Sequence, residues 1–132
     1  MTATGRLVLV STPIGNLGDL SPRAVETLRS CALICCEDTR HSGKLLSHAG
    51  VSGVRLAIAN EHTELARLDE VLGLLAAGSD VAVVTDAGTP GISDPGARLV
   101  RAAVEAGYVV SAVPGPAALV MALVISGFDS TR

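Results

Sequence analysis

Three segments of the sequence concentrate glycine, proline and other small residues. They cover residues 11–19, 86–96 and 114–118. Small residues let a ligand approach the backbone closely, and prolines fix the shape of a loop before binding, which lowers the entropic cost. Together the three segments predict a preformed ligand pocket. The alternative is that each segment is an ordinary turn, because Gly-Pro dipeptides are common between elements.

Side chains that could move a proton lie in or between these segments. They are Glu37, Asp38, Glu61, His62 and Asp86. A general base has to come within hydrogen-bond reach of the proton that it removes. Structural roles are open for the same residues, because Glu37 or Asp38 could cap a helix that begins near Arg40, His62 could line a pocket wall, and Asp86 could only hydrogen-bond a ligand.

The common phosphate- and dinucleotide-binding motifs do not fit the sequence. Residues 42–44 read Ser-Gly-Lys like the end of a P-loop, but Asp38 stands where that motif needs its first glycine. The first segment offers only Gly15 and Gly18 of the three glycines of a Rossmann fingerprint. A Walker site is therefore excluded, and a dinucleotide or Rossmann-type methyltransferase site is only weakly indicated.

The cysteines indicate reduced thiols. Cys31, Cys35 and Cys36 are odd in number and two are adjacent, which is typical of a cytosolic chain rather than a disulfide framework. With His41 they could ligate a metal, but the spacing is poor and adjacent cysteines on a strand point to opposite faces. We therefore expect no metal site.

Five short apolar runs predict the strands that must position the candidate residues. They cover residues 7–10, 33–36, 54–58, 81–85 and 109–113. Their starts lie 26, 21, 27 and 28 residues apart, which is the length of a strand–helix unit. Because the runs are mostly uninterrupted, both faces of each strand should be covered. The sequence predicts an α/β fold with an open, mainly parallel five-stranded sheet flanked by helices.

Helix signals occupy the intervening segments. Ser21 and Asp94 each precede a proline and are expected to be N-caps, and Gly78 and Gly107 are expected to end helices. One face of the third helix should carry four leucines, Leu65, Leu68, Leu72 and Leu75. Since open α/β sheets bind ligands beyond the carboxyl ends of their strands, the loops after strands one, four and five should form the site.

Composition limits the partners of the chain. Its 132 residues fit one domain, and a net charge of −3 excludes an RNA binder held mainly by bulk charge. The two aromatic residues, Tyr108 and Phe128, cannot build a base-stacking platform. Contact with RNA would need a local patch, and Arg40, Lys44 and His48 form such a stripe at helical spacing. A solvated helix face is an equally good interpretation of that stripe.

The uncharged stretch 106–128 is long enough on paper to cross a bilayer. However, Pro-Gly-Pro at residues 114–116 interrupts it, and residues 117–125 would rise only about 14 Å as a helix. We expect a buried strand, a tight turn and a short buried helix there. The N-terminus lacks the layout of a signal peptide, so a cytoplasmic location without membrane contact is expected.

Five motifs carry a resemblance to a known family. They are residues 9–21, 37–40, 60–62, 85–96 and 113–116. They closely resemble the ribosomal RNA small-subunit methyltransferase I family of the tetrapyrrole methylase superfamily, over about residues 7–129. Members of this family carry a second α/β domain. The resemblance therefore implies a cofactor-binding domain over residues 1–127 and, at residues 128–132, the start of a linker to a second domain that this chain lacks.

The resemblance implies S-adenosylmethionine as methyl donor and, as acceptor, the 2′-hydroxyl of a cytidine in the decoding region of 16S ribosomal RNA in the small subunit. The cofactor contacts that it implies are Pro13, Gly15, Asp86, Ala87, Gly88, Thr89, Pro90, Ile92, Ser93, Pro114, Gly115, Ala117 and Ala118. Its candidate catalytic residues are Asp86, Glu37, Asp38 and His62, and RNA would contact Arg40, Lys44 and His48.

The resemblance further implies a homodimer. Residues 88–90 read Gly-Thr-Pro where the tetrapyrrole-modifying relatives have Gly-Asp-Pro, which favours the RNA branch of the superfamily. A methyltransferase for tetrapyrrole precursors and a non-catalytic ligand-binding domain are the alternatives. By itself the chain is expected to fold but to show weak or no activity.

Overall fold

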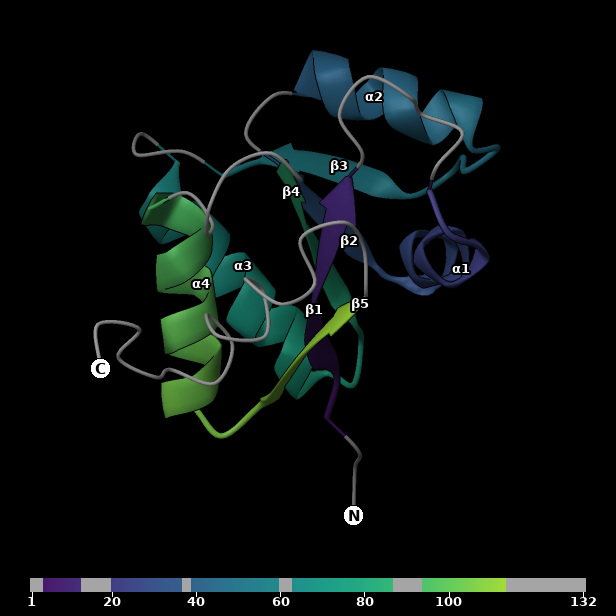
Figure 1. Cartoon of the computed structure of the whole chain (residues 1–132). Coiled ribbons are helices and arrows are strands. Elements are labelled where there is room, and N and C mark those ends of the chain that lie inside the picture. Colours follow the sequence, from purple (N-terminus) through teal and green to yellow (C-terminus); the bar gives the residue numbers. More distant parts are fainter. Residues whose placement is uncertain (1–3, 13–19, 37–38, 60–62, 87–93, 114–132) are drawn as a thin grey trace, which may run out of the picture.

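A computed structural model describes residues 4–12, 20–36, 39–59, 63–86 and 94–113. Five strands form one parallel sheet in the order β3-β2-β4-β1-β5 (Figure 1). The strands are β1 (Arg6–Thr12), β2 (Leu33–Cys36), β3 (Arg55–Ile58), β4 (Val81–Asp86) and β5 (Val109–Val113). The predicted α/β class and all five strands are confirmed, each end within two residues.

Four helices cover the two faces of the sheet. They are α1 (Pro22–Ser30), α2 (Thr39–His48), α3 (Glu64–Ala76) and α4 (Asp94–Glu105). Helices α1 and α2 lie on one side of the sheet, and α3 and α4 lie on the other (Figure 1). The fold therefore has three layers, with apolar cores on both sides of the sheet.

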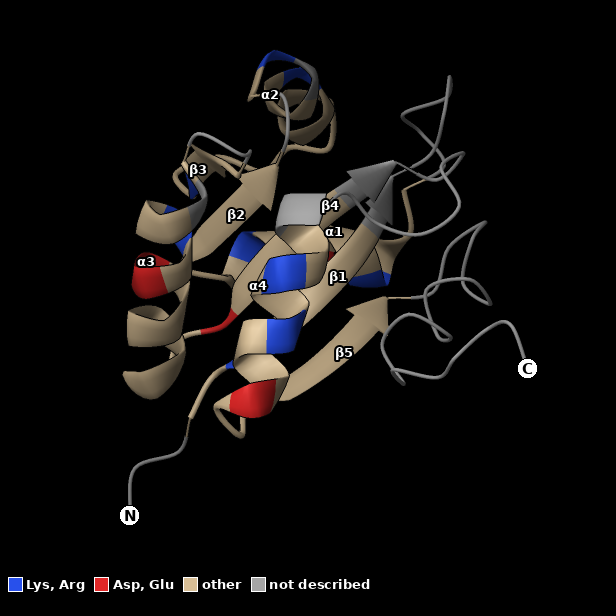
Figure 2. Cartoon of the chain, turned by 90° about the vertical axis from the view of Figure 1, so that its left-hand side faces the viewer, with Lys and Arg blue, Asp and Glu red and all other residues tan. Residues whose placement is uncertain are grey.

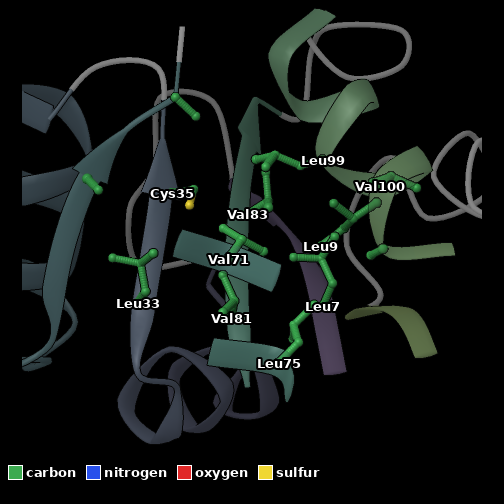
Figure 3. Close-up of a cluster of buried hydrophobic side chains, with 13 residues drawn as sticks. Leu7, Leu9, Leu33, Cys35, Val71, Leu75, Val81, Val83, Leu99 and Val100 are labelled. Carbon is green, nitrogen blue, oxygen red and sulfur yellow. The ribbon is translucent and has the colours of Figure 1, made fainter. Parts of the chain in front are cut away.

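The period of a strand explains the two cores. In β1, Leu7 and Leu9 pack with α3 and α4, whereas Val8 and Val10 pack with α1 and α2. Figure 3 shows the first of these clusters, in which Leu7 and Leu9 lie close to Val71 and Leu75 of α3. Because both faces are covered in the middle of the sheet, the four central positions of β1 are all apolar, as its uninterrupted run predicted. The expectation that every strand is covered on both faces is wrong for the edge strands β3 and β5, and Val109 is 57% exposed.

The local signals for helix ends are mostly confirmed. The Ser21 side chain accepts a hydrogen bond from the backbone N–H of Ala24 at 3.1 Å, which caps α1. Gly78 and Gly107 follow α3 and α4 with φ of 93° and 87°, a left-handed conformation that glycine adopts without strain. Helix α4 begins at Asp94 itself, one residue earlier than predicted.

The prediction for the apolar face of α3 is wrong at Leu65, which is 79% exposed. Val71 and Leu75 are buried, and Leu68 is partly buried against the same cluster. At about 100° per residue, Leu65 lies about 120° around the helix from Val71. The four leucines form a stripe, but α3 is rotated so that Val71 faces the sheet and Leu65 faces solvent.

The three cysteines are buried free thiols. Cys35 packs in the core beneath α3 and α4, and Cys36 in the core beneath α1 and α2, so the expected opposite orientation is confirmed. Among the residues that the structure describes, no group of His, Cys, Asp and Glu is arranged to hold a metal ion. No helix in the described ranges is long and apolar enough to cross a membrane.

Alkaline solution is expected to destabilise the fold through Cys35, because burial raises the pKa of this thiol from 9.0 to about 12. Above about pH 9 the unfolded thiol ionises while the folded one keeps its proton. Stability is therefore lost as the pH rises from about 9 towards 12, by at most about 1.4 kcal/mol per pH unit. Urea denaturation at several pH values across this range gives the free energy of unfolding as a function of pH. This free energy should fall less steeply with pH for Cys35→Ala than for the unaltered chain. An equally steep fall in both proteins would contradict the role of Cys35.

Candidate functional site

The carboxyl ends of three neighbouring strands meet at one edge of the sheet. Thr12 at the end of β1 pairs with Asp86 at the end of β4, and Val10 pairs with Val113 at the end of β5. The strand ends that precede the three glycine- and proline-rich segments thus lie side by side. Because the carboxyl ends of β1, β4 and β5 are neighbours, the segments that follow them start close enough together to share one site.

The chain changes its winding direction at this same place. Helix α1, which follows β1, packs through Ala24 and Leu28 on one face of the sheet. Helix α4, which follows β4, packs through Leu99 and Ala103 on the opposite face. The connections after two adjacent parallel strands therefore separate to opposite faces, and this is the topological switch point at which open α/β sheets bind their ligands.

The sheet beneath the switch point is apolar and tightly packed. Val10 of β1, Val84 of β4 and Val113 of β5 are 0%, 8% and 3% exposed. These side chains belong to the core between the sheet and α1, so they hold the strand ends in place. The polar contacts for a ligand at this edge would have to come from the strand ends and from the segments that follow them.

Strand order also ranks the candidate acids and bases. Asp86 ends β4 at the switch point, Glu37 and Asp38 follow the adjacent strand β2, and Glu61 and His62 follow the edge strand β3. At about 4.8 Å between neighbouring strands, the end of β3 lies about 10 Å from the end of β4. The topology therefore favours the residues after β4 and β2 over those after β3.

Most of the predicted site residues lie outside the described part of the chain. Asp86 is described as the last backbone position of β4. The predicted site residues that lie outside the described part are Pro13, Gly15, Glu37, Asp38, Glu61, His62, Ala87, Gly88, Thr89, Pro90, Ile92, Ser93, Pro114, Gly115, Ala117 and Ala118. The turn and short helix expected after β5 also lie outside it. These assignments remain predictions.

The three residues of the predicted basic stripe share the outer side of α2. Arg40, Lys44 and His48 are exposed, whereas Leu45 and Leu46 are buried against the sheet. Residues 42–44, which end like a P-loop, lie inside this helix. All three side chains are thus in contact with solvent, and the role of the stripe in RNA binding stays a prediction.

Sequence reasoning missed two groups of charged residues. Arg55 of β3 and Arg67 of α3 both pair with Glu70, which ties the edge strand to its covering helix. Arg23 lies exposed in the first turn of α1. A signal for Arg23 was present in the sequence, because the positive end of a helix dipole favours acidic residues over arginine in the first turn.

Comparison with known proteins identifies the family. The family model described as "Tetrapyrrole (Corrin/Porphyrin) Methylases" matches residues 6–132. The chain belongs to this family. A solved tetrapyrrole methylase, the uroporphyrin-III-C-methyltransferase from Thermus thermophilus, matches 95% of this chain and 54% of its own with a TM-score of 0.64. At 22% identity this match supports the fold alone.

Curated relatives within the tetrapyrrole methylase family are more similar in sequence. The chain is 52% identical over 132 residues to a ribosomal RNA small subunit methyltransferase I from Xylella fastidiosa strain Temecula1, covering 100% of this chain and 48% of the relative. It is 47% identical over 128 residues to the protein of that name from Escherichia coli O157:H7, covering 97% and 44%. The chain thus spans about half the length of these relatives, and the resemblance seen in its motifs is confirmed.

Proposed function

We propose that the protein containing this chain transfers a methyl group from S-adenosylmethionine to ribosomal RNA of the small subunit. The acceptor in this proposal is the 2′-hydroxyl of a cytidine in the decoding region of 16S ribosomal RNA. The observation that carries it is the 46–52% identity, along nearly the whole chain, to relatives named ribosomal RNA small subunit methyltransferase I. Residues 1–127 would form the cofactor-binding domain, and residues 128–132 would begin the linker to a second one.

The described part of the switch point fits S-adenosylmethionine. The strands that meet there are anchored by the buried residues Val10, Val84 and Val113, and Asp86 is the last residue of β4. Gly88 and Gly115, in the segments after β4 and β5, would let the cofactor approach the backbone. When bound, the cofactor supplies a methyl group that its positively charged sulfur already activates. The task of the chain is then to hold the acceptor hydroxyl in line and to exclude water.

Removal of the hydroxyl proton is assigned to a carboxylate near the end of β4. We infer that Asp86, Glu37 and Asp38 are the strongest candidates, because β2 and β4 are adjacent in the sheet. His62 and Glu61 are weaker candidates because β3 lies one strand further away. Arg40, Lys44 and His48 would contact the RNA, and a second domain and the second subunit of a homodimer would supply further contacts. The protein would act in the cytoplasm.

The proposal is tested by methyl transfer from labelled S-adenosylmethionine to small ribosomal subunits. The test needs a longer chain that includes the second half present in the relatives, followed by mass mapping of ribose methylation. We expect label on a cytidine ribose, and Asp86→Asn is expected to lower the rate about 100-fold or more if Asp86 is the base. Transfer to a porphyrin precursor but not to RNA would replace the proposal with the tetrapyrrole alternative. Cofactor binding without any transfer would indicate a non-catalytic domain.

A further inference from the structure

The two helical layers of the fold carry opposite net charge. Within their bounds, α1 and α2 contain four basic residues, Arg23, Arg29, Arg40 and Lys44, and a single acidic residue, Glu26. Helices α3 and α4 contain three basic and five acidic residues. The net charge is therefore +3 for one layer and −2 for the other, in a chain whose total is −3. In Figure 2, α2 carries blue segments, α3 carries red, and α4 carries two blue segments and a red one near its end.

The positive charges of the α1–α2 layer are exposed. Arg23, Arg40 and Lys44 are all exposed, and Arg29 approaches Glu26 only at 3.9 Å on a solvated face. In the α3–α4 layer, the Arg67 guanidinium pairs with Glu70. An exposed ion pair neutralises little of the field of its layer, and one acidic residue cannot balance four basic ones. Within their bounds, the helices α1 and α2 thus carry exposed positive charge.

Two of these arginines lie where folding alone does not favour them. Arg23 and Arg40 occupy the first turns of α1 and α2, and neither first turn contains an acidic residue. The N-terminus of a helix is its positive end, so a cation there costs about 0.3–1 kcal/mol where an acid would gain a similar amount. At the start of α1, the helix end and Arg23 together attract an anion. Helix α2 begins directly after two acidic residues, Glu37 and Asp38, so the argument is weaker there.

The same two arginines lie at the edge of the sheet that holds the candidate site. Each helix begins after the carboxyl end of a strand, since α1 follows β1 and α2 follows β2. Their first turns therefore belong to the end of the molecule at which β1 and β4 finish. A polyanion lying along the α1–α2 layer would reach this edge without crossing the acidic layer.

We propose that the α1–α2 layer is the face that the protein turns towards its RNA, with Arg23 as a phosphate contact in addition to the α2 stripe. The α3–α4 layer is turned away from the RNA because its net charge would repel phosphates. The choice of RNA as the polyanion rests on the proposed function. The exposed positive charge of α1 and α2 itself rests on the charges and exposure of the described residues.

The test compares two charge reversals that change net charge equally. Arg23→Glu places an acid in the first turn of α1, which favours the fold, whereas Arg101→Glu alters an exposed residue of α4. Binding of the chain to 16S ribosomal RNA is measured by filter binding between about 20 and 200 mM salt. We expect Arg23→Glu to weaken binding about 10-fold at low salt and to reduce the salt slope by about 1. Arg101→Glu is expected to change affinity by less than about twofold.

Equal weakening by both variants, weakening by Arg101→Glu alone, or absence of RNA binding by the unaltered chain would each overturn the proposed face. Methyl transfer and S-adenosylmethionine binding, measured with the same substitutions in the longer chain, separate this failure from failure of the proposed function. Transfer that persists unchanged in Arg23→Glu would leave the function and refute the face. RNA binding that depends on Arg23 without any methyl transfer would keep the face and refute the function.

Discussion

Valine in place of Gly88 is expected to reduce S-adenosylmethionine binding by about 100-fold. Gly88 lies in the segment that follows β4 at the switch point, where the proposed cofactor site needs close approach to the backbone. A β-branched side chain forced into an occupied volume costs about 1–3 kcal/mol, and each 1.4 kcal/mol is tenfold in affinity. The same substitution at Gly115, after β5, is expected to act alike. Calorimetric titration of the longer chain measures both.

Gly73→Val is the matched control for these substitutions. Gly73 lies in α3, and a Cβ atom added there meets nothing within 4 Å. Cofactor binding should therefore remain unchanged in this variant. Retention of full affinity after valine at both Gly88 and Gly115 would remove the cofactor from the switch point.

Alanine in place of Gly5 is expected to lower the free energy of unfolding by about 3 kcal/mol or more. A Cβ atom at this position would lie 1.8 Å from the carbonyl oxygen of Ser79, and this neighbour is backbone rather than a flexible side chain. The Gly5 N–H also donates to the carbonyl of Leu75, near the end of α3, at 2.8 Å. Gly5 therefore cannot move away from the end of α3 without losing that hydrogen bond. Urea denaturation of the two proteins gives the difference.

The control for Gly5 is Gly73→Ala. In the open environment of Gly73, alanine is expected to stabilise the fold by up to about 1 kcal/mol, because it loses less backbone entropy in a helix. Gly5→Ala could instead leave the free energy of unfolding within about 1 kcal/mol of that of the unaltered chain. This result would show that Gly5, before β1, and Ser79, before β4, can move apart at little cost.

The strands could be predicted because each contains a short run rich in apolar residues, which is uninterrupted in β2, where both faces are buried. The runs 33–36 and 109–113 were placed at the observed bounds, and the N-cap at Ser21 follows from a local hydrogen bond. The buried side of α3 was misjudged at Leu65 because rotation of a helix about its axis is set by the sheet that it covers. Strand order and the pairing of Arg55 with Glu70 join distant segments, for which a single sequence holds no local signal.

For the candidate site, the sequence predicted which strand ends would carry it. The sequence placed three glycine- and proline-rich segments after strands one, four and five, and the structure brings those strand ends to one edge. The separation of α1 and α4 to opposite faces needed the strand order, which emerges only when the sheet is assembled. Arg23 was overlooked because a single basic residue becomes informative only beside the other charges of its layer.

The position of β1 has a consequence for biosynthesis. Of the five described strands, β1 is made first, whereas both of its neighbours, β4 and β5, are made after the other three, so that Leu7 has to wait for Val81 and Val110. While β2 and β3 are made, the apolar strand β1 therefore has no partner strand. Contacts so distant in sequence form slowly and leave intermediates that are prone to aggregation. Chaperone contact with the nascent protein should accordingly concentrate on residues 6–12 until β4 emerges.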